Sequence, residues 1–364
     1  MSAVDEVETI GVRARPETAA TDEAADAAPA EARPFPARGA MLPSLFRLAF
    51  DLSLLPIAAL VLVGRIGNKD WLFDMTNFFR PHIAVVALLF VLVAVFSASL
   101  PRISVAGLLL VAALYPLLVP SVPAAAAAPN PSLRVTTANV NGRNRDFESF
   151  RRVVEAAAPD ILVIEEVTWP WDPTIASLPG LPYLSDPRLA RRSSIRIASR
   201  YPVTAELVEL EGLAKPTDDI GGSVALRAIV DIPGAKRPTV LYGIHPPTTR
   251  KAQGWVGRNA YLRALAYRIA AEPKGTNIIV AGDWNTPYWS PMVRNFMRVS
   301  SLVTTERGAW PEPTRFFREF GAPPFLGTPI DRIAVSKDIG VAAINVSKDF
   351  GSDHLAVTAD LAIP

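Results

Sequence analysis

Three apolar blocks near the start of the chain, residues 45–64, 82–100 and 103–119, restrict its fold more than any other feature. The first block carries Arg47 and Asp51, and the other two carry no charge. A membrane-spanning helix needs about 20 apolar residues, and roughly 17 are sufficient. The alternative, a helical hairpin buried in a soluble core, would leave these helices without a polar face toward water. We therefore predict three transmembrane helices that form a compact anchor.

The segments around these blocks divide the chain into four predicted parts. Residues 1–40 are acidic and rich in Ala, Glu and Pro without apolar periodicity, so we expect a disordered N-terminal tail. No short apolar core follows Met1, which argues against a signal peptide. Residues 41–120 form the predicted anchor, 121–132 a short stiff Pro/Ala linker, and 133–364 a soluble domain.

The basic residues predict an orientation in the membrane. Lys and Arg precede the first block and occupy both short loops, but none lies between the third block and Arg134. Because cytoplasmic segments carry the excess of positive charge, we expect a cytoplasmic N-terminus, and three crossings then place the soluble domain outside the cytoplasm. The Arg- and Ala-rich composition is compatible with a bacterial source. The predicted location is the bacterial inner (cell) membrane, with the soluble domain on its periplasmic or extracytoplasmic side.

From residue 133 onward, short β-rich runs alternate with helical patterns at 147–157 and 255–271. The predicted strands are residues 133–138, 160–164, 194–199, 223–231, 239–244, 277–281, 330–335 and 355–361. Many strands with few helices indicate an α/β layered sandwich. The chain has no cysteine, which excludes thiolate nucleophiles and Cys-ligated zinc.

Polar residues of unusual kinds gather at the ends of these predicted strands. They are Asn139, Asn141, Glu165, Glu166, His245, Asp283, Asn285, Asp331, Asp353 and His354. Taken singly, each can be a turn residue or a solvated loop residue. Because strand ends on one rim of a sheet converge, the whole set can meet in one cleft. Carboxylate and amide oxygens suit Mg²⁺, Mn²⁺ or Ca²⁺ rather than zinc, and a carboxylate that pairs with a histidine prepares it for acid–base catalysis.

The segments that carry these residues resemble the ordered motifs of the endonuclease/exonuclease/phosphatase superfamily, which has the deoxyribonuclease-I-like fold. Gly-Asp-Trp-Asn at 282–285 and Ser-Asp-His at 352–354 are the most specific of them. The resemblance runs from residue 133 to the C-terminus and excludes the apolar blocks. It implies a four-layer α/β sandwich and a metal-dependent hydrolase of phosphodiesters. Relatives include secreted deoxyribonucleases, abasic-site endonucleases, neutral sphingomyelinases and inositol-polyphosphate phosphatases.

The resemblance also implies a role for each matched residue. The implied metal ligands, for Mg²⁺ or else Mn²⁺ or Ca²⁺, are Asn139, Glu166 and Asp353. The implied catalytic residues are His354 as general base, Asp331 as the group that holds it, His245 as a phosphate contact and acid, and Asp283 and Asn285 to orient water. The predicted substrate contacts are Asn141, Arg196 and Arg200. The two arginines belong to a basic segment at 188–200 that can equally be a solvated face.

Departures from the family pattern narrow the choice of activity. Asn141 and His245 stand where abasic-site enzymes carry Asp and Tyr, which favours a deoxyribonuclease or sphingomyelinase style of enzyme. Trp284 can stack on a base, lie at a lipid interface or pack in the core. We predict a membrane-anchored, metal-dependent phosphodiesterase of nuclease type that acts on nucleic acid, next to the lipid bilayer and without an obligate protein partner. The alternatives are a phospholipid phosphodiesterase, a phosphatase, or an inactive binding module.

Overall fold

The computed structural model describes residues 38–96, 99–210, 223–306 and 311–364. The chain divides into two compact units, Met1–Leu48 and Ala49–Pro364. Most of the predicted disordered tail, residues 1–37, lies outside the described residues. The described part of the first unit is the beginning of helix α1 (Arg38–Val63), and all other elements belong to the second unit.

The apolar blocks form helices, and a short additional helix lies between the first two blocks. They are α1, the 3-10 turn η1 (Gly64–Ile66), α2 (Trp71–Phe78), α3 (Arg80–Phe96) and α4 (Leu100–Leu118). By length and composition, Ser44–Ile66 and Leu100–Leu118 are each able to cross a membrane. The middle block passes the same test only when α2 and α3 are taken together, and these two helices are bent by 71° relative to one another. The structure therefore holds two candidate spans, or three if the bent pair is one.

Helix α2 occupies a stretch for which the sequence predicted only a loop. Its N-terminus is capped by Asp70, whose side chain accepts a hydrogen bond from the backbone N–H of Leu72 at 2.8 Å. One face of the helix buries polar side chains, namely Asp74, Thr76 and Asn77. Buried polar groups need hydrogen-bond partners, and Asp74 finds them in Trp255, Arg258 and Ser290. Asn77 donates to the carbonyl oxygen of Gly64, and Thr76 donates to that of Phe73.

Beyond residue 132 the chain forms two six-stranded sheets. The first has the order β11-β12-β1-β2-β4-β3, with β1 (Leu133–Asn139), β2 (Ile161–Glu165), β3 (Tyr183–Leu184), β4 (Arg196–Ser199), β11 (Gly340–Val346) and β12 (Val357–Ala362). The second has the order β5-β6-β7-β8-β10-β9, with β5 (Val203–Glu209), β6 (Val224–Val230), β7 (Thr239–Ile244), β8 (Asn277–Asp283), β9 (Val303–Thr304) and β10 (Asp331–Val335). All eight predicted strands are confirmed, and β3, β5, β9 and β11 are additional.

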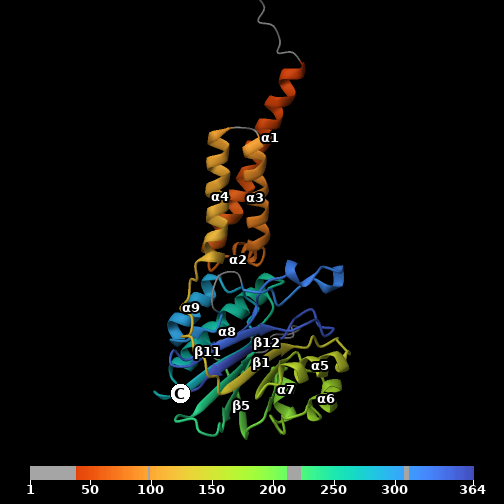
Figure 1. The fold of residues 1–364 in the computed structure, drawn as a ribbon, viewed down its shortest axis with the longest axis vertical. Coiled ribbons are helices and arrows are strands. Elements are labelled where there is room, and N and C mark those ends of the chain that lie inside the picture. The colour runs from red at the N-terminus through yellow and green to blue at the C-terminus, as the bar shows by residue number, and fades with distance from the viewer. Residues whose placement is uncertain (1–37, 97–98, 211–222, 307–310) are drawn as a thin grey trace, which may run out of the picture. The chain divides into compact units, whose positions relative to one another are not determined.

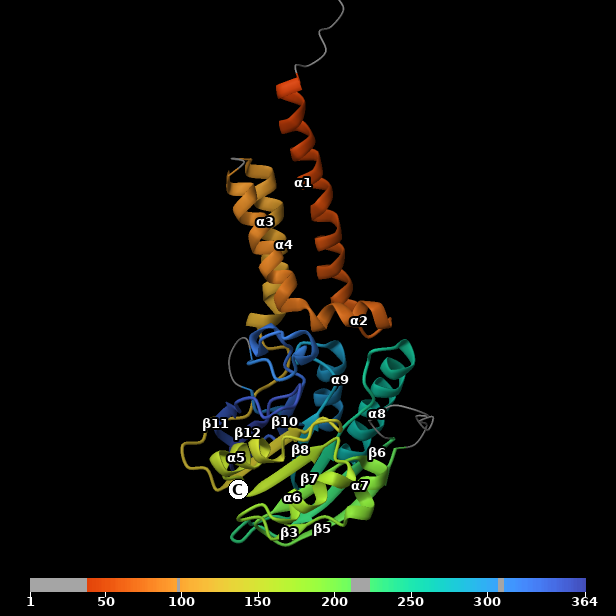
Figure 2. The same cartoon turned by 90° about the vertical axis from the view of Figure 1, so that its right-hand side faces the viewer.

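Helices cover the outer faces of both sheets, which confirms the predicted four-layer α/β sandwich (Figures 1 and 2). The sheets enclose a common apolar core that includes Val135, Ile161, Leu241 and Ile279. The helices of this part are α5 (Phe147–Ala157), α6 (Asp172–Ala176), α7 (Pro187–Ser193), α8 (Ala252–Ala270) and α9 (Pro291–Ser300), with 3-10 turns η2 (Trp169–Trp171), η3 (Arg318–Phe320) and η4 (Pro324–Leu326). A core around Phe150 fixes α5 to the first sheet, and the apolar side chains of α8 and α9 cover the second.

The Pro/Ala segment at 121–132, which the sequence predicted as a short stiff linker, is bound along the domain. Ala124 forms a parallel bridge with Thr304 of β9, and Ala127 forms one with Val341 of β11. The segment thus pairs with edge strands of both sheets. Unpaired strand edges are open to pairing with other chains, so this contact protects the edges as well as connecting the parts.

Strand direction brings the predicted site residues to one rim. In the first sheet β1 and β2 are parallel, and in the second β7 and β8 are parallel. Their carboxyl ends therefore lie at the same edges of the sheets. Strands β10 and β12 run antiparallel to β8 and β1, so the residues at their beginnings reach the same rim.

Candidate active site

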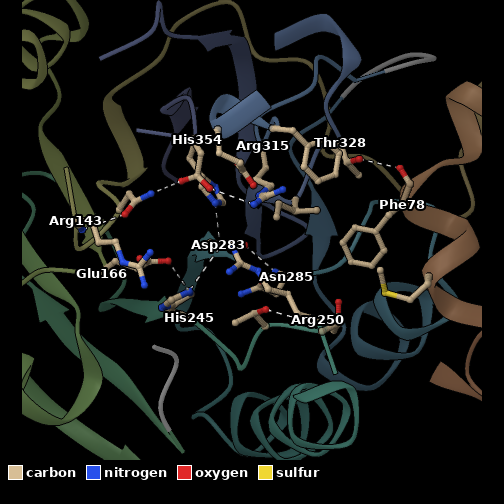
Figure 3. Close-up of a pocket in the computed structure, with 18 of the residues that line it drawn as sticks. Phe78, Arg143, Glu166, His245, Arg250, Asp283, Asn285, Arg315, Thr328 and His354 are labelled. Atoms are coloured by element: carbon tan, nitrogen blue, oxygen red, sulfur yellow. Dashed lines mark hydrogen bonds and ion pairs between the residues drawn. The ribbon is translucent and has the colours of Figure 1, made fainter. Parts of the chain in front are cut away.

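A cavity of about 500 Å³ opens at this rim. Its polar lining includes Glu166, His245, Asp283, Asp353 and His354, which come from different strand ends of the two sheets (Figure 3). The structure therefore brings together residues that are up to 188 positions apart in the sequence (354 − 166).

Asn139 links the two sheets at the floor of the site. Its side-chain Nδ2 donates hydrogen bonds of 3.1 Å to Glu166 Oε1 and of 3.1 Å to Asp283 Oδ2. His245 lies beside the same two carboxylates, with Nε2 at 3.8 Å from Glu166 Oε1 and 3.6 Å from Asp283 Oδ2. Asn139, Asp283 and His245 are fully buried, so this constellation is rigidly held.

Three site residues adopt left-handed backbone conformations, namely Asn141 (φ 56°), Glu166 (φ 58°) and Asn285 (φ 49°). Such conformations are uncommon for residues other than glycine. In the described part of the chain the remaining residues of this kind, Ala158, Ser194 and Ser301, each end a helix. The three site residues end no helix, so their strain serves the site, where it turns side chains into the cavity.

Gly282, which precedes Asp283, permits the close approach of strands β7 and β8. A Cβ atom at this position would lie 2.0 Å from the carbonyl oxygen of Ile244, and the backbone φ is 154°. Only glycine fits this combination. The glycine of the Gly-Asp-Trp-Asn motif is therefore required by the backbone, because it allows the strand ends that carry His245 and Asp283 to lie side by side.

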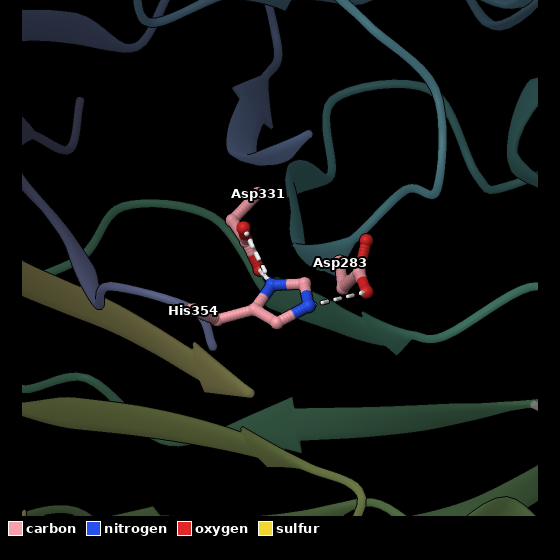
Figure 4. Close-up of side chains that lie close together, drawn as sticks. All are labelled: Asp283, Asp331 and His354. Carbon is pink, nitrogen blue, oxygen red and sulfur yellow. Dashed lines mark hydrogen bonds and ion pairs between the residues drawn. The ribbon is translucent and has the colours of Figure 1, made fainter. Parts of the chain in front are cut away.

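His354 lies between two aspartates (Figure 4). Its Nδ1 is hydrogen-bonded to both carboxylate oxygens of Asp331, at 2.9 and 3.0 Å, and its Nε2 is 3.8 Å from Asp283 Oδ2. Burial lowers the pKa of His354, but the charges of Asp331 and Asp283 outweigh it and raise the pKa to about 10. Burial, followed by the charge of Asp331, raises the pKa of Asp283 to about 6. In the metal-free protein the imidazole therefore binds its second proton more tightly than a free histidine does.

Asp353 also lines the cavity and is already paired. Its Oδ1 accepts a hydrogen bond from Asn141 Nδ2 at 2.8 Å, and its Oδ2 lies 3.2 Å from Arg315 Nη2. Burial raises the pKa of Asp353, but His354, Arg315 and Asn141 together hold it below its usual value. Its contacts make Asp353 a partner of cationic and amide groups in this structure, away from the Glu166–Asp283 pair.

Glu165, the neighbour of Glu166, points away from the cavity. It is fully buried, and its Oε1 accepts a hydrogen bond of 2.6 Å from Thr137 Oγ1. Burial raises its pKa well above the usual value, and the side chain packs as a polar core residue. The alternation of side chains along the strand end separates the two glutamates, and only Glu166 reaches the site.

Two predicted substrate contacts do not join the site. Arg196 is buried, and its Nη1 lies 2.6 Å from Asp172 Oδ1. Arg200 follows the far end of β4 and pairs with Asp160 at 2.7 Å. Neither lines the cavity, because each guanidinium is bound to a carboxylate elsewhere. Trp284 is likewise a core residue, with its ring centroid 4.7 Å from that of Phe296 and no exposed surface.

The structure adds three arginines that the sequence analysis did not select. Arg143, Arg250 and Arg315 line the cavity, and the first two form no ion pair with any described residue. Arg143 follows Asn141 by two positions, and Arg250 ends the loop that begins at His245. Their positions close to the matched motifs could have identified both arginines from the sequence. Their free guanidinium groups suit phosphate oxygens.

Helix α2 forms another wall of the cavity, which the sequence did not predict. Met75, Phe78 and Phe79 line it on the side away from Glu166 (Figure 3). The helix is held by hydrogen bonds to the loops of the site. Trp71 Nε1 donates to Thr249 O at 2.8 Å, Thr328 Oγ1 donates to Phe78 O at 2.8 Å, and Trp289 Nε1 donates to Asn77 O at 2.8 Å.

A buried ion pair ties α2 to the catalytic loop. Asp74 pairs with Arg258 of α8, and neither side chain is exposed to solvent beyond 2%. Arg258 Nη1 in turn donates a hydrogen bond of 3.0 Å to the carbonyl oxygen of Asn285. The backbone N–H of Asn285 donates to Asp283 Oδ1 at 2.8 Å, so one chain of contacts runs from α2 to the carboxylate of Asp283.

Two carboxylate groupings fit a hard divalent cation. Asp283, Asp331 and His354 offer ligand atoms within 4.8 Å of one another. In that grouping the Nδ1 of His354 is already used by Asp331, so a cation would have to displace a hydrogen bond. Glu166 and Asp283 face a common point beside Asn139 and keep free carboxylate lone pairs. Their oxygen donors are those that Mg²⁺ prefers.

Comparison with known proteins gives a family match. Residues 136–354 match the model described as the Endonuclease/Exonuclease/phosphatase family. No match was found among curated proteins. Similar solved structures include a sphingomyelinase C from Streptomyces griseocarneus, which is 16% identical with a TM-score of 0.47 and covers 63% of this chain and 99% of that one.

Two further solved structures have similar statistics. An endonuclease/exonuclease/phosphatase from Beutenbergia cavernae is 20% identical with a TM-score of 0.49, and the match covers 64% of this chain and 72% of that one. A mutant of beta toxin from Staphylococcus aureus with bound magnesium ions is 15% identical with a TM-score of 0.48, and the match covers 63% and 99% of the two chains.

Proposed function

Because the chain belongs to the endonuclease/exonuclease/phosphatase family, we propose that it is a membrane-anchored, divalent-metal-dependent hydrolase of phosphodiester bonds. The observation that carries this proposal is the meeting of Asn139, Glu166, His245, Asp283 and His354 at one cavity. Two candidate spans, or three with the bent pair, supply the anchor.

Glu166 and Asp283 are the residues that would hold the metal ion, with Asn139 beside them. A bound Mg²⁺ supplies positive charge to a phosphoryl oxygen and to the leaving group. The buried position of Asp283 and the left-handed backbone of Glu166 keep both carboxylates at the cavity floor. Asp353, which the family resemblance also implies as a ligand, would have to leave Arg315 and Asn141 to take part.

The chain's own residues orient the attacking water and exchange the proton. Asp283, which would hold the metal, lies beside Asn285, and the two side chains can orient an attacking water. His354 is held by Asp331 through Nδ1, which leaves its Nε2 on the side of Asp283, where it can exchange a proton with water or with a phosphoryl oxygen. His245, Arg143 and Arg250 add donors for the remaining phosphate oxygens.

Hydrolysis of bis(p-nitrophenyl) phosphate by the full-length protein tests this proposal. We expect Mg²⁺-dependent turnover that a Glu166→Gln variant loses by about 10²-fold or more, because the metal-binding charge is removed. The matched control is Glu155→Gln on the exposed face of α5, which should keep wild-type activity. Equal activity of wild type and Glu166→Gln would refute the metal assignment.

The substrate can be nucleic acid or phospholipid, and one observation favours the second. The arginines expected to bind flanking nucleic-acid phosphates, Arg196 and Arg200, are paired away from the cavity. The cavity wall formed by α2 is apolar, and the loop that carries Phe320 and Phe325 exposes their rings to 81% and 75%. That loop contacts the beginning of α3, where His82 Nε2 lies 3.1 Å from Leu326 O.

A substrate panel separates the two candidates. We expect faster Mg²⁺-dependent hydrolysis of sphingomyelin or phosphatidylcholine in mixed micelles than of plasmid DNA. The reverse order would favour the nuclease assignment. If neither is cleaved, calorimetry decides between an unidentified phosphodiester and an inactive binding module, because a protein with no affinity for Mg²⁺ or Mn²⁺ fits only the second.

A further inference from the structure

A second cavity, of about 460 Å³, lies apart from the catalytic residues. None of its lining residues lines the first cavity. Its lining includes the guanidinium-bearing side chains of Arg65, Arg80 and Arg294 and contains neither Asp nor Glu among the described residues. This is a concentrated positive charge without a visible counter-charge.

Arg80 is the most unusual of these residues. It is only 1% exposed, and its Nε and Nη1 have no hydrogen-bond partner among the described residues. Its Nη2 makes only long hydrogen bonds, 3.4 Å to Val61 O and 3.4 Å to Asn77 Oδ1. A buried charge without a partner costs several kcal/mol. An anion in the adjacent cavity would satisfy the free N–H donors of Arg80 and neutralise its charge.

Arg65 and Arg294 also lack a counter-charge. Neither forms an ion pair with a described residue, and Arg65 is held only by Tyr115, whose ring centroid lies 5.7 Å from its guanidinium carbon, and by Ala112 O at 3.4 Å. By contrast, Arg102, also on the apolar helices, is paired with Asp51 through two hydrogen bonds of 2.6 and 2.7 Å. Arg102 shows that an arginine on these helices can pair with a carboxylate, a partner that Arg65, Arg80 and Arg294 lack among the described residues.

The cavity lies where three apolar helices end. Turn η1 follows α1, Arg80 is the first residue of α3, and Tyr115 lies in the last turn of α4. If these helices cross a membrane, their ends mark the level of the phospholipid headgroups. Basic pockets at helix ends on this level recognise anionic headgroups, and the forked donors of arginine match phosphate oxygens.

We propose that this cavity is a phosphate-binding site, which takes either the headgroup of an anionic phospholipid or a free phosphate ion. The volume exceeds that of a phosphate ion and is within the range of ligand pockets, about 300–1,000 Å³, so a headgroup with its glycerol fits the space. Arg80 binds the phosphate from the buried side, and Arg65 and Arg294 bind it from the rim. The inference depends on membrane anchoring and is independent of the catalytic activity.

The test uses the full-length protein, delipidated in a neutral detergent. Binding of short-chain phosphatidylglycerol, phosphatidylcholine and inorganic phosphate is measured by native mass spectrometry and thermal shift. We expect phosphatidylglycerol to bind at least tenfold more tightly than phosphatidylcholine. Replacing one guanidinium by an uncharged amide, in Arg80→Gln or Arg294→Gln, should weaken it about tenfold or more, since a charge-assisted hydrogen bond contributes about 1.5–3 kcal/mol.

A matched control lies on the same helix. Arg298→Gln removes a charge from α9 one turn beyond Arg294, outside the cavity, and should bind phosphatidylglycerol like the wild type. If Arg80→Gln fails to fold, the exposed Arg294 still provides the comparison. Inorganic phosphate that binds as tightly as the lipid supports the site and identifies the free ion as its ligand. No preference for phosphatidylglycerol or phosphate over phosphatidylcholine, or unchanged binding in the cavity variants, would overturn the proposal.

Discussion

Close spacing of buried charges determines the chemistry of the site at the level of single residues. Asp283 and Asp331 are direct cross-strand neighbours of β8 and β10, and His354 bridges them. Burial, followed by repulsion from the charge of Asp331, raises the pKa of Asp283. Attraction to the charges of Asp331 and Asp283 raises the pKa of His354.

The charged state of His354 predicts a pH-dependent stability in metal-free buffer. The folded-state pKa, about 10, lies above the ordinary value of 6.5. The folded protein therefore binds this proton more tightly than the unfolded chain, and the stabilisation is complete below pH 6.5 and lost as pH rises through about 10. We expect the difference in Tm between wild type and His354→Gln to be largest near pH 6.5 and to shrink toward pH 10. A difference that stays constant over this range would contradict the assignment.

Gly282 predicts a second effect at single-residue scale. In Gly282→Ala the new methyl group meets the carbonyl oxygen of Ile244 at 2.0 Å, so β7 and β8 must move apart. Overpacking of this kind costs about 1–3 kcal/mol, and the shift should also displace His245 from Asp283 and reduce kcat. Gly275→Ala is the control, because its φ is also positive, 85°, but nothing lies within 4 Å of the added Cβ. Equal losses of Tm in the two variants would show that backbone strain alone is responsible.

Among the secondary-structure elements, α2 departs most from what the sequence indicated. Residues 65–81 contain charges and lie between two apolar blocks, which is the pattern of a loop. The helix exists because Asp74 and Asn77 find partners on α8 and in the 285–290 loop, and such partners are invisible to a local pattern. Strands were easier, because a buried strand is apolar throughout. Strands β5 and β11 were not predicted, because their residues alternate between buried and partly exposed positions and form no continuous apolar run.

The buried ion pair of α2 predicts coupled losses of stability and activity. Asp74→Asn leaves Arg258 buried without a counter-charge, which costs about 3–5 kcal/mol and frees the guanidinium that fixes Asn285. We expect a lower Tm and a reduced kcat with little change in KM. Asp70→Asn in the same helix should be nearly neutral, because Asn caps a helix as well as Asp does. A variant of Asp74 with wild-type kcat would separate α2 from catalysis.

At the scale of the whole molecule, the motifs predicted the catalytic centre better than its surroundings. Apart from Glu165, which is buried against Thr137, the predicted strand-end residues reached the rim, because strand direction determines which end of each strand lies there. Arg196 and Arg200 did not, because the direction of a side chain on β4 depends on partners such as Asp172. The sequence could not predict that α2 forms a wall of the cavity. That position depends on contacts between segments far apart in the chain, such as Asp74 and Arg258, which are 184 positions apart.

The number of membrane crossings predicts the relative sides of the two termini. If α2 and α3 together form one span, the chain crosses three times and the termini lie on opposite sides, whereas two spans place them on the same side. We expect three crossings and an extracytoplasmic C-terminus. Alkaline phosphatase fused after Pro364 should then be active and green fluorescent protein at the same position should be dark. Fluorescence without phosphatase activity would establish a cytoplasmic catalytic domain.

One apolar cluster joins the helices to the enzyme. It includes Val61 and Ala113 of the candidate spans together with Leu265 and Phe296, which pack under the second sheet. Together with the ion pair of Asp74, this core holds the two regions by side-chain contacts as well as by the peptide chain. Cutting the backbone at 121–132 would therefore nick the protein without shedding the hydrolase. Separating the 133–364 domain from the apolar helices would also require the contacts of this cluster to break.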